Sequence, residues 1–247
     1  MMVLKTLSAL GTVAAASLLL ATTAEARDAV VVSPNHMHDW FFFNDNNNGP
    51  GTGHMVEGPG DPPLGSGSAE LGVVNTGDRQ ALGTQAYNET MLGDITHLSY
   101  WTHQTDPSHA MPLQHNIRYH PADTGWQGRL VFEPGNGNPG IVSGAWQQWT
   151  PMGGRWWASQ TGATGSNGLC PQSRPCTWNQ VKSNWPQASV NGTLLFKAGG
   201  GWGLWVGNVD ALTIGVHDHA TRTYDFEPAA MTKAMAKMAT AGTERAL

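Results

Sequence analysis

Four tryptophans lie in glycine-flanked or loop-like segments, where their rings could bind a flat apolar surface. They are Trp156, Trp157, Trp202 and Trp205. An indole offers a large apolar face, and such faces stack on the C–H faces of pyranose rings. The chain has 11 tryptophans but only 13% charged residues, and a large exposed apolar patch on a protein usually has a partner. The pattern predicts a sugar-binding platform, with packing beneath the long segment 151–192 as the alternative explanation.

The other tryptophans are expected to be structural. Trp40, Trp101 and Trp126 lie in or beside strand-like runs, which favours burial in the core. Trp146 and Trp149 are three residues apart, so in an extended strand their side chains point to opposite faces. We therefore expect one of these two rings inside and the other outside.

Two glutamates have similar surroundings that suit acid–base chemistry. Glu133 and Glu227 each follow a phenylalanine and precede a proline. A glycosidase uses two carboxylates about 5 to 10 Å apart across the scissile bond, so this pair predicts a polysaccharide hydrolase or lyase as an alternative function. A strand-end carboxylate that accepts backbone N–H groups explains the motif equally well. The chain lacks the Gly-x-Ser-x-Gly and His-Glu-x-x-His signatures, and a non-catalytic role is the first interpretation.

Both cysteines lie in one short segment, at Cys170 and Cys176. In an oxidising compartment this spacing predicts one disulfide that closes a small loop. A small ring removes little chain entropy, so such a bond would hold a loop in place more than it would stabilise the whole fold. A metal site built on the two thiolates is the alternative, but no second pair of ligands lies nearby.

The first 26 residues have the order of a secretion signal. Lys5 precedes an apolar run over 10–20, and Ala24-Glu25-Ala26 fits a small-x-small cleavage site. The apolar run is too short for a membrane span, and no later segment is long enough for one. Loss of Lys5 and Glu25 leaves the net charge at −5, which argues against nucleic acid and anionic membrane partners. We therefore expect a secreted chain, extracellular or periplasmic, with a polysaccharide or a cell-surface glycan as partner.

Short β-type runs separated by glycine and proline fill the chain between 27 and 228. The alternation at 113–119 puts Leu113, His115, Ile117 and Tyr119 on one face. Many short strands with turn residues between them predict an all-β sandwich or barrel with one core. The expected strands are 29–33, 40–43, 68–74, 95–102, 113–119, 129–133, 145–150, 193–198, 209–216 and 221–226.

One short helix is predicted after the second cysteine, within an insertion at 151–188. Thr177 is a suitable N-cap, and Trp178, Val181 and Trp185 share a face by their spacing of three and four. The segment 229–247 is rich in Ala, Met, Lys and Thr, and it has no glycine before Gly242. We expect a flexible or helical tail there, outside the core.

From about residue 30 to Pro228 the chain resembles an uncharacterised family of secreted bacterial proteins. The resemblance rests on the stretches 39–45, 58–71, 130–134, 146–149, 207–215 and 223–228. The run His115-Asn116-Ile117-Arg118 departs from it, because more acidic residues are expected there. A Gly-x-Gly-Ser-x-x-Leu run near the start and Val-Asp-x-Leu-x-Ile near the end are similar to jelly-roll carbohydrate-binding modules. This likeness implies a single jelly-roll-type sandwich whose first and last strands pair.

The same likeness implies a structural calcium ion held by acidic residues at the ends of those strands. Asp210 is the matching position, with Asn44, Asp45 or Glu70 as partners. Calcium takes six to eight oxygen ligands, and the run from Asn44 to Asn48 is dense in them. A turn is the alternative for this run, because asparagine tolerates left-handed geometry and caps its own backbone.

Two His-x-His pairs suit transition metals by residue type. His36 and His38, and likewise His217 and His219, would share a face in an extended strand. The first pair follows a Ser-Pro turn and the second includes Asp218 at an apparent hairpin tip. Exposed loop histidines are therefore the preferred interpretation.

Overall fold

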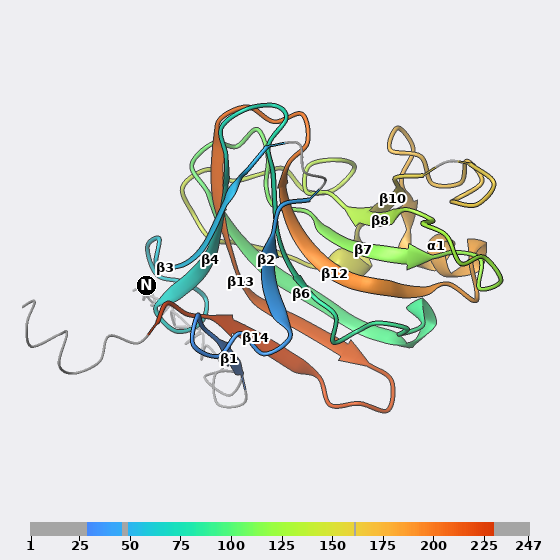
Figure 1. The fold of residues 1–247 in the computed structure, drawn as a ribbon, viewed down its shortest axis with the longest axis horizontal. Coiled ribbons are helices and arrows are strands. Elements are labelled where there is room, and N and C mark those ends of the chain that lie inside the picture. The colour runs from blue at the N-terminus through green and yellow to red at the C-terminus, as the bar shows by residue number, and fades with distance from the viewer. Residues whose placement is uncertain (1–28, 46–48, 161, 230–247) are drawn as a thin grey trace, which may run out of the picture.

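Two curled β-sheets pack face to face in the computed structural model, which describes residues 29–45, 49–160 and 162–229 (Figure 1). The architecture is an all-β sandwich, as the short alternating runs predict. The segment 1–26 and nearly all of the segment 229–247 lie outside the described residues, so the predictions made for them stay predictions. No helix among the described residues has the length and apolar character needed to cross a membrane.

The first sheet is organised around its longest strand, β13. Its strands, in sheet order, are β1 (Val30–Val32), β14 (Arg222–Phe226), β13 (Trp205–Val216), β4 (Gly67–Val73) and β3 (Thr52–Glu57). β6 (Ile95–Gln104) also pairs with β13, and β9 (Gln147–Trp149) pairs with β6. β1 runs parallel to β14, with Val30 opposite Tyr224, so the first and last described strands do pair.

The second sheet carries the strands that build the functional site. Their order is β11 (Cys176–Thr177), β10 (Arg155–Ala158), β8 (Arg129–Phe132), β7 (Leu113–Arg118), β12 (Ser189–Gly199), β5 (Arg79–Thr84) and β2 (Trp40–Phe43). All of these neighbours are antiparallel. Along an antiparallel strand one face can lie on the core while the other meets solvent, and successive side chains alternate between the two faces.

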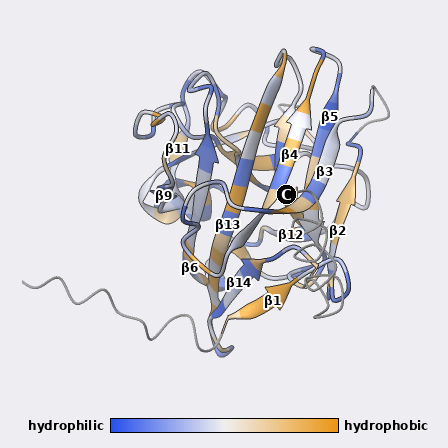
Figure 2. Cartoon of the chain, turned by 90° about the vertical axis from the view of Figure 1, so that its left-hand side faces the viewer, coloured by the Kyte–Doolittle hydropathy of each residue, from blue (hydrophilic) through white to orange (hydrophobic). Residues whose placement is uncertain are grey.

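Aromatic rings from both sheets fill the space between them. Trp40 of the second sheet packs edge-on against Phe226 of the first, with ring centroids 5.0 Å apart. Tyr100 of β6 packs against Phe196 of β12 at 5.2 Å. Hydrophobic residues recur along β13, β2 and β1 in Figure 2, as expected for strands that each bury a face. These ring contacts join the two sheets, and buried aliphatic side chains such as Leu71 and Leu82 complete the core.

The insertion contains the predicted helix, α1 (Trp178–Asn184). Thr177 caps it: its hydroxyl accepts a hydrogen bond from the Gln180 backbone N–H, and the Gln180 side chain accepts one from the Thr177 N–H. Trp178, Val181 and Trp185 are all buried, as their spacing predicts. Cys170 and Cys176 form the expected disulfide, and two short 3-10 turns lie at Leu92–Asp94 and Pro151–Gly153.

Four strands have no counterpart among the expected ones: β3, β5, β10 and β11. β3 and β5 each contain a glycine and polar residues at positions that break a simple alternation. Trp156 and Trp157 were expected in a loop, but they lie in β10, where Trp156 pairs with Phe132 of β8. These segments are strands because their neighbours supply hydrogen bonds, which β-propensity alone does not reveal.

His115 is the most unusual member of the core. It is fully buried in β7, it stacks on Trp156 at 5.3 Å, and neither ring nitrogen has a hydrogen-bond partner. Burial lowers the pKa of His115 to about 3, because the cation would lose its hydration without gaining a partner. The histidine is therefore neutral in the folded protein.

This burial predicts a stability loss in mild acid. In the unfolded chain His115 has a pKa of about 6.5, so it binds a proton below that pH. The folded chain does not bind this proton until the pH approaches 3. The unfolding free energy therefore falls as the pH falls from about 6.5 toward 3. Replacement of the imidazole by an apolar group removes this term. When the pH is lowered from 7 to 4.5, the unfolding free energy of the wild type should fall by roughly 2 to 3 kcal/mol more than that of His115→Leu.

Urea denaturation of both proteins at the two pH values measures the difference. His97→Leu, at an exposed position of β6, is the matched control and should keep the wild-type pH dependence. Equal losses in the wild type and His115→Leu would show that the folded protein binds a proton at His115 as readily as the unfolded chain does.

Candidate functional site

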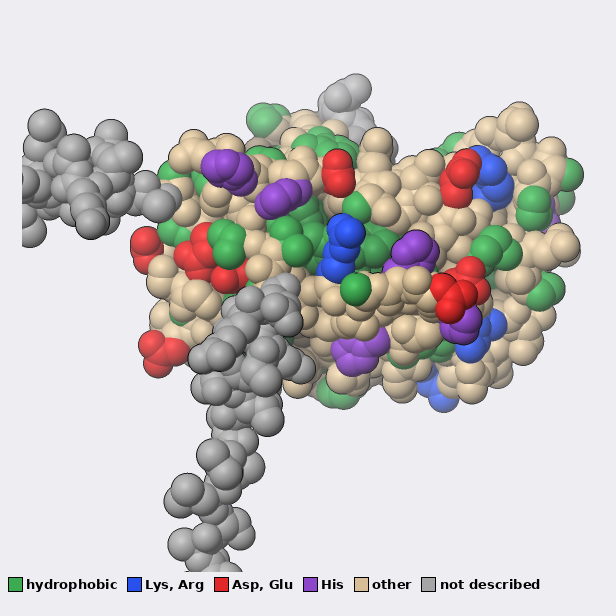
Figure 3. Space-filling model, turned by 90° about the horizontal axis from the view of Figure 1, so that it is seen from below, with side chains coloured by type: hydrophobic (Ala, Val, Ile, Leu, Met, Phe, Trp, Pro, Cys, Tyr) green, Lys and Arg blue, Asp and Glu red, His purple; other side chains and the backbone are tan. Residues whose placement is uncertain are grey.

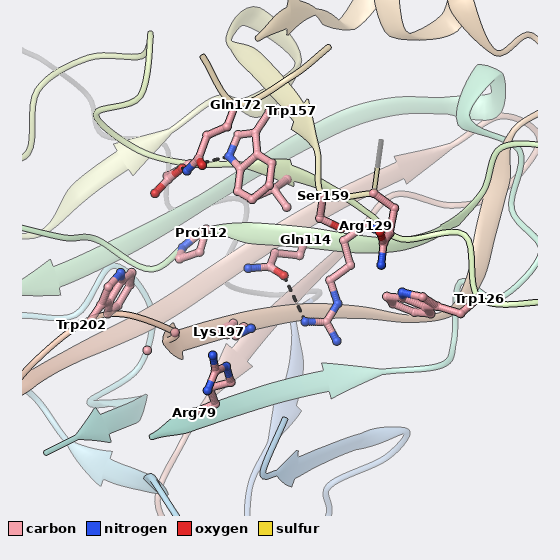
Figure 4. A pocket seen from close by; sticks show the side chains of 15 residues that line it. Arg79, Pro112, Gln114, Trp126, Arg129, Trp157, Ser159, Gln172, Lys197 and Trp202 are labelled. Atoms are coloured by element: carbon pink, nitrogen blue, oxygen red, sulfur yellow. Dashed lines mark hydrogen bonds between the residues drawn. The ribbon is translucent and has the colours of Figure 1, made fainter. Parts of the chain in front are cut away.

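An open groove of about 590 Å³ lies on the outer face of the second sheet (Figure 4). Its lining residues come from strands of this sheet and from the loops beside it. They are Arg79, Pro112, Gln114, Trp126, Arg129, Val131, Glu133, Trp157, Ser159, Gln160, Gln172, Lys197, Gly199, Gly200 and Trp202.

Strand alternation decides which side chains reach the groove. In β7, His115 points into the core, so its neighbour Gln114 points outward. In β12, Phe196 is buried and Lys197 faces the groove. In β10 the same rule buries Trp156 and turns Trp157 toward the groove. The groove and the aromatic core thus lie on opposite faces of the second sheet.

Three indole rings border the groove. Trp126, in the loop before β8, is 52% exposed, and the Arg129 guanidinium lies 5.6 Å from its ring centroid. Trp157 is half-buried, and its Nε1–H donates to the Glu133 carboxylate at 2.9 Å. Trp202 is buried and stacks on His109, with ring centroids 4.2 Å apart, so only a small part of its ring is exposed to the groove. Figure 4 shows the three rings around a central group of polar side chains.

One carboxylate organises the centre of the groove. Asp45 accepts from both terminal nitrogens of Arg129 at 2.6 Å and pairs with Lys197 at 2.7 Å. Burial acts to raise the pKa of Asp45, but the hydrogen bonds and charges of Arg129 and Lys197 outweigh it and hold the pKa at about 2. Asn116 accepts a further bond from the Arg129 Nε–H at 2.8 Å. Arg129 is therefore held as a rigid part of the floor.

Amide and hydroxyl side chains supply the remaining polar lining. Gln114, Ser159, Gln160 and Gln172 each combine a donor with an acceptor. Gln172 donates to Glu133 at 3.0 Å, which adds to the bond from Trp157. The Glu133 carboxylate is thus engaged at the groove wall.

Of the four tryptophans proposed for stacking, the structure brings two to the groove. Trp157 and Trp202 line it, while Trp156 and Trp205 are buried. Successive side chains of β10 alternate between the two faces of the sheet, so Trp156 lies in the core and Trp157 at the groove. Trp205 is the first residue of β13, and its Nε1–H donates to the His109 carbonyl. Trp126 was expected in the core, yet its ring is the most exposed of those bordering the groove, because its segment is a loop rather than a strand. Its place between Gly125 and Gly128 was a signal for a loop.

The rings of Trp40 and Trp149 are buried, and Trp101 is half-buried. Trp146 is also partly exposed and donates to the Pro59 carbonyl at 2.8 Å. Trp149 and Trp146 thus divide between inside and outside, as their spacing predicts.

The two glutamates of the alternative catalytic site are not brought together. Glu133 follows β8 and lines the groove, whereas Glu227 follows β14 in the other sheet. Glu227 accepts from the backbone N–H groups of Ser66 at 2.7 Å and Gly67 at 3.1 Å. That is the structural role weighed for a strand-end carboxylate, so the structure does not supply the second acid of a glycosidase pair at Glu227.

The four residues named for calcium do not form one site. Asn44 and Asp45 follow β2 of the second sheet, while Glu70 and Asp210 lie in β4 and β13 of the first. The Asp45 oxygens face two cations, and Asp210 accepts from the backbone N–H groups of Phe226 at 3.0 Å and Leu64 at 3.2 Å. These contacts do not test calcium binding, so the calcium ion stays a prediction. Burial, opposed by these N–H groups, raises the pKa of Asp210 to about 8.

No group of three metal-binding side chains occurs within 29–45, 49–160 and 162–229. The His-x-His pairs agree with the loop interpretation. His36, His38, His217 and His219 are all exposed, and His217 contacts Asp218 at 2.9 Å.

Basic side chains are few and lie apart on the face seen from below in Figure 3. The groove differs, because Arg79, Arg129 and Lys197 meet on its floor. The fold and this site define the class: a β-sandwich with an open groove of aromatic, amide and basic side chains on one sheet.

Comparison with known proteins shows no family for this chain. No model of a protein family matches it, and no curated protein matches it in sequence. The resemblance to a family of secreted bacterial proteins therefore stays a prediction.

Three solved structures are similar in outline. A family 11 carbohydrate-binding module from Clostridium thermocellum, in complex with a β-1,3-1,4-mixed-linked tetrasaccharide, has 9% identity and a TM-score of 0.43 over 74% of this chain and 92% of its own. The family 11 module of the cellulosomal cellulase Lic26A-Cel5E of Clostridium thermocellum has 9% identity and a TM-score of 0.44 over 73% and 90%. The enzymatically active domain of tailspike protein 4 of bacteriophage CBA120 has 10% identity and a TM-score of 0.40 over 72% and 19%. Likeness of this degree carries no functional argument, so the function must be argued from the groove.

The shared carboxylate predicts a large effect of a small change. Asp45→Asn leaves two poorly exposed cations without their counter-charge, and we expect a loss of about 2 to 4 kcal/mol of unfolding free energy at pH 7. Because the folded pKa of Asp45 is depressed, its stabilising contribution is present above about pH 4 and is lost as the pH falls toward 2.

Urea denaturation at pH 7 measures the loss. Asp39→Asn, which alters an exposed aspartate near the other end of β2, is the matched control and should change stability by less than about 0.5 kcal/mol. Equal effects of the two substitutions would contradict the organising role of Asp45.

Proposed function

We propose that this protein is a carbohydrate-binding domain and that the groove on the second sheet is its glycan site. The observation that carries the proposal is the 52% exposed Trp126 ring at the border of a groove that also holds Trp157. An exposed indole of this size gains most when an apolar surface covers it. The partners proposed are a polysaccharide or a cell-surface glycan.

The polar lining supports a sugar in preference to a purely apolar ligand. Each sugar hydroxyl both donates and accepts, and Gln114, Gln160 and Gln172 offer the same combination at the groove wall. Ring faces and amide groups together suit a pyranose, which has apolar C–H faces and a polar rim. The groove is open rather than closed over, which suits a polymer that continues beyond the site.

A binding role without catalysis is proposed because the lining of the groove contains one carboxylate, Glu133, whereas a glycosidase uses two. Glu133 is bonded to Trp157 and Gln172, and Asp45 is paired with two cations. Export is proposed as well, because the signal-like segment at 1–26 and the disulfide between Cys170 and Cys176 agree with an oxidising compartment. A purely structural envelope protein would not need the exposed ring of Trp126.

The proposal predicts that binding depends on the bordering rings. In a pull-down with insoluble polysaccharides, followed by titration of the retained glycan, Trp126→Ala and Trp157→Ala should each weaken binding at least about tenfold, or about 1.4 kcal/mol. The experiment is run with calcium chloride and with a chelator, which tests calcium dependence directly. Release of reducing ends is measured in the same samples to test for hydrolysis.

Trp101→Ala is the matched control, because Trp101 is a half-buried tryptophan of the other sheet, beside a separate hollow. It should bind like the wild type. Unchanged affinity in both groove variants would show that the glycan site is elsewhere, and failure to retain any glycan would overturn the function itself.

A further inference from the structure

The floor of the groove has more positive than negative charge, although the whole chain has a net charge of −5. Arg79, Arg129 and Lys197 reach it from β5, β8 and β12. The carboxylates near them are Asp45, which is shared between Arg129 and Lys197, and Glu133 at the groove wall. The negative net charge of the whole chain therefore does not describe the charge of the groove floor, where a ligand would bind.

Hydrogen-bond capacity shows which of these cations remain available. The terminal nitrogens of Arg129 face Asp45, and its Nε–H faces Asn116. Among the described residues, the Arg79 side chain makes one hydrogen bond, which it donates to the Gly77 carbonyl at 2.7 Å. Lys197 has three donors and contacts Asp45 with its Nζ. Arg79 and Lys197 thus keep donors for a ligand.

The free donors of Arg79 and Lys197 lie close together beside Gly200. A methyl carbon placed on Gly200 would lie 3.5 Å from Arg79 Nε, 3.9 Å from Arg79 Nη2 and 3.9 Å from Lys197 Nζ. Arg79, Lys197 and Gly200 all line the open groove, and Gly200 has no side chain that could cover the two cations. Two like charges this close repel one another, and an anion between them removes the repulsion and takes up their free donors.

We propose that the glycan bound in this groove is acidic and that its anionic group lies between Arg79 and Lys197. This inference rests on the proposed glycan site. The group is a carboxylate of a hexuronic acid or a sulfate ester, which share negative charge and several acceptor oxygens. Arg79 offers the fork of donors that such planar or multidentate anions accept, and Lys197 adds a point charge.

A single anion-binding point fits an acidic sugar better than a nucleic acid. Binding a phosphodiester chain requires a stripe of cations along its path. Here the free cations occupy one position on the floor, while Trp126 and Trp157 border other parts of the groove. Aromatic rings beside one anion-binding point match a polymer whose sugar units each carry a negative charge.

Polygalacturonate and its carboxyl-reduced form make a matched pair of probes, because only the carboxylate differs. Dextran sulfate and dextran form the corresponding pair for a sulfate ester. Isothermal titration of the full chain should show binding to one acidic probe at least about tenfold tighter than to its neutral partner. Arg79→Gln should remove this preference, and Arg79→Lys should retain part of it. Comparison of the polygalacturonate pair with the dextran sulfate pair shows whether the site binds a carboxylate or a sulfate ester.

The matched control is Lys182→Gln combined with Arg222→Gln, which lowers the net charge outside the groove, in α1 and in β14. It is compared with Arg79→Gln combined with Lys197→Gln, and it should keep the wild-type preference. Sodium chloride at 0.5 M should also reduce the acidic preference of the wild type, because added salt screens partly exposed charges.

Three results would overturn the inference. Equal affinity for acidic and neutral partners would do so while leaving the glycan site intact. Unchanged preference in Arg79→Gln would place the anion elsewhere. Binding of oligo-dT that depends on Arg79, without binding of either acidic polysaccharide, would replace the sugar with a nucleic acid. If the wild type binds none of the four polysaccharides and no other glycan in a wider screen, the proposed carbohydrate-binding function is wrong, and the inference about acidic glycans is wrong with it.

Discussion

The alternation of side chains along the strands of the second sheet is the constraint on which the groove depends. His115, Phe132, Trp156 and Phe196 fill the space between the sheets, and this leaves the residues beside them on the outer face. A shift of one residue in any of these strands would exchange core and groove positions. The dense aromatic packing, with Trp156 between His115 and Trp178, therefore sets the position of Trp157 as well.

Within the groove, the ion pairs of Asp45 give the floor its rigidity. A buried carboxylate that holds two cations is costly to desolvate, and it is retained here where it orients Arg129 and Lys197. Arg129 in turn lies over Trp126, so the exposed ring is held from one side. The charged centre and the aromatic border thus form one connected arrangement.

The inserted segment extends the second sheet and closes one side of the site. β10 and β11 add two strands to the edge of β8, and α1 packs its tryptophan face against the core. The disulfide between Cys170 and Cys176 lies in the loop that carries Gln172 to the groove wall. A small covalent ring can restrict such a loop without contributing much to the stability of the whole fold.

Local patterns were enough to predict the sandwich, most of its strands, the capped helix and the disulfide. The periodicity at 113–119, the N-cap Thr177 and the cysteine spacing all act over a few residues, so they are visible in the chain. The site could not be predicted in this way. Arg79, Arg129 and Lys197 are far apart in sequence and meet because β5, β12, β7 and β8 are neighbours in one sheet. Only strand order and register, which depend on long-range pairing, decided that Trp157 and Trp126 border the groove while Trp156 and Trp205 are buried.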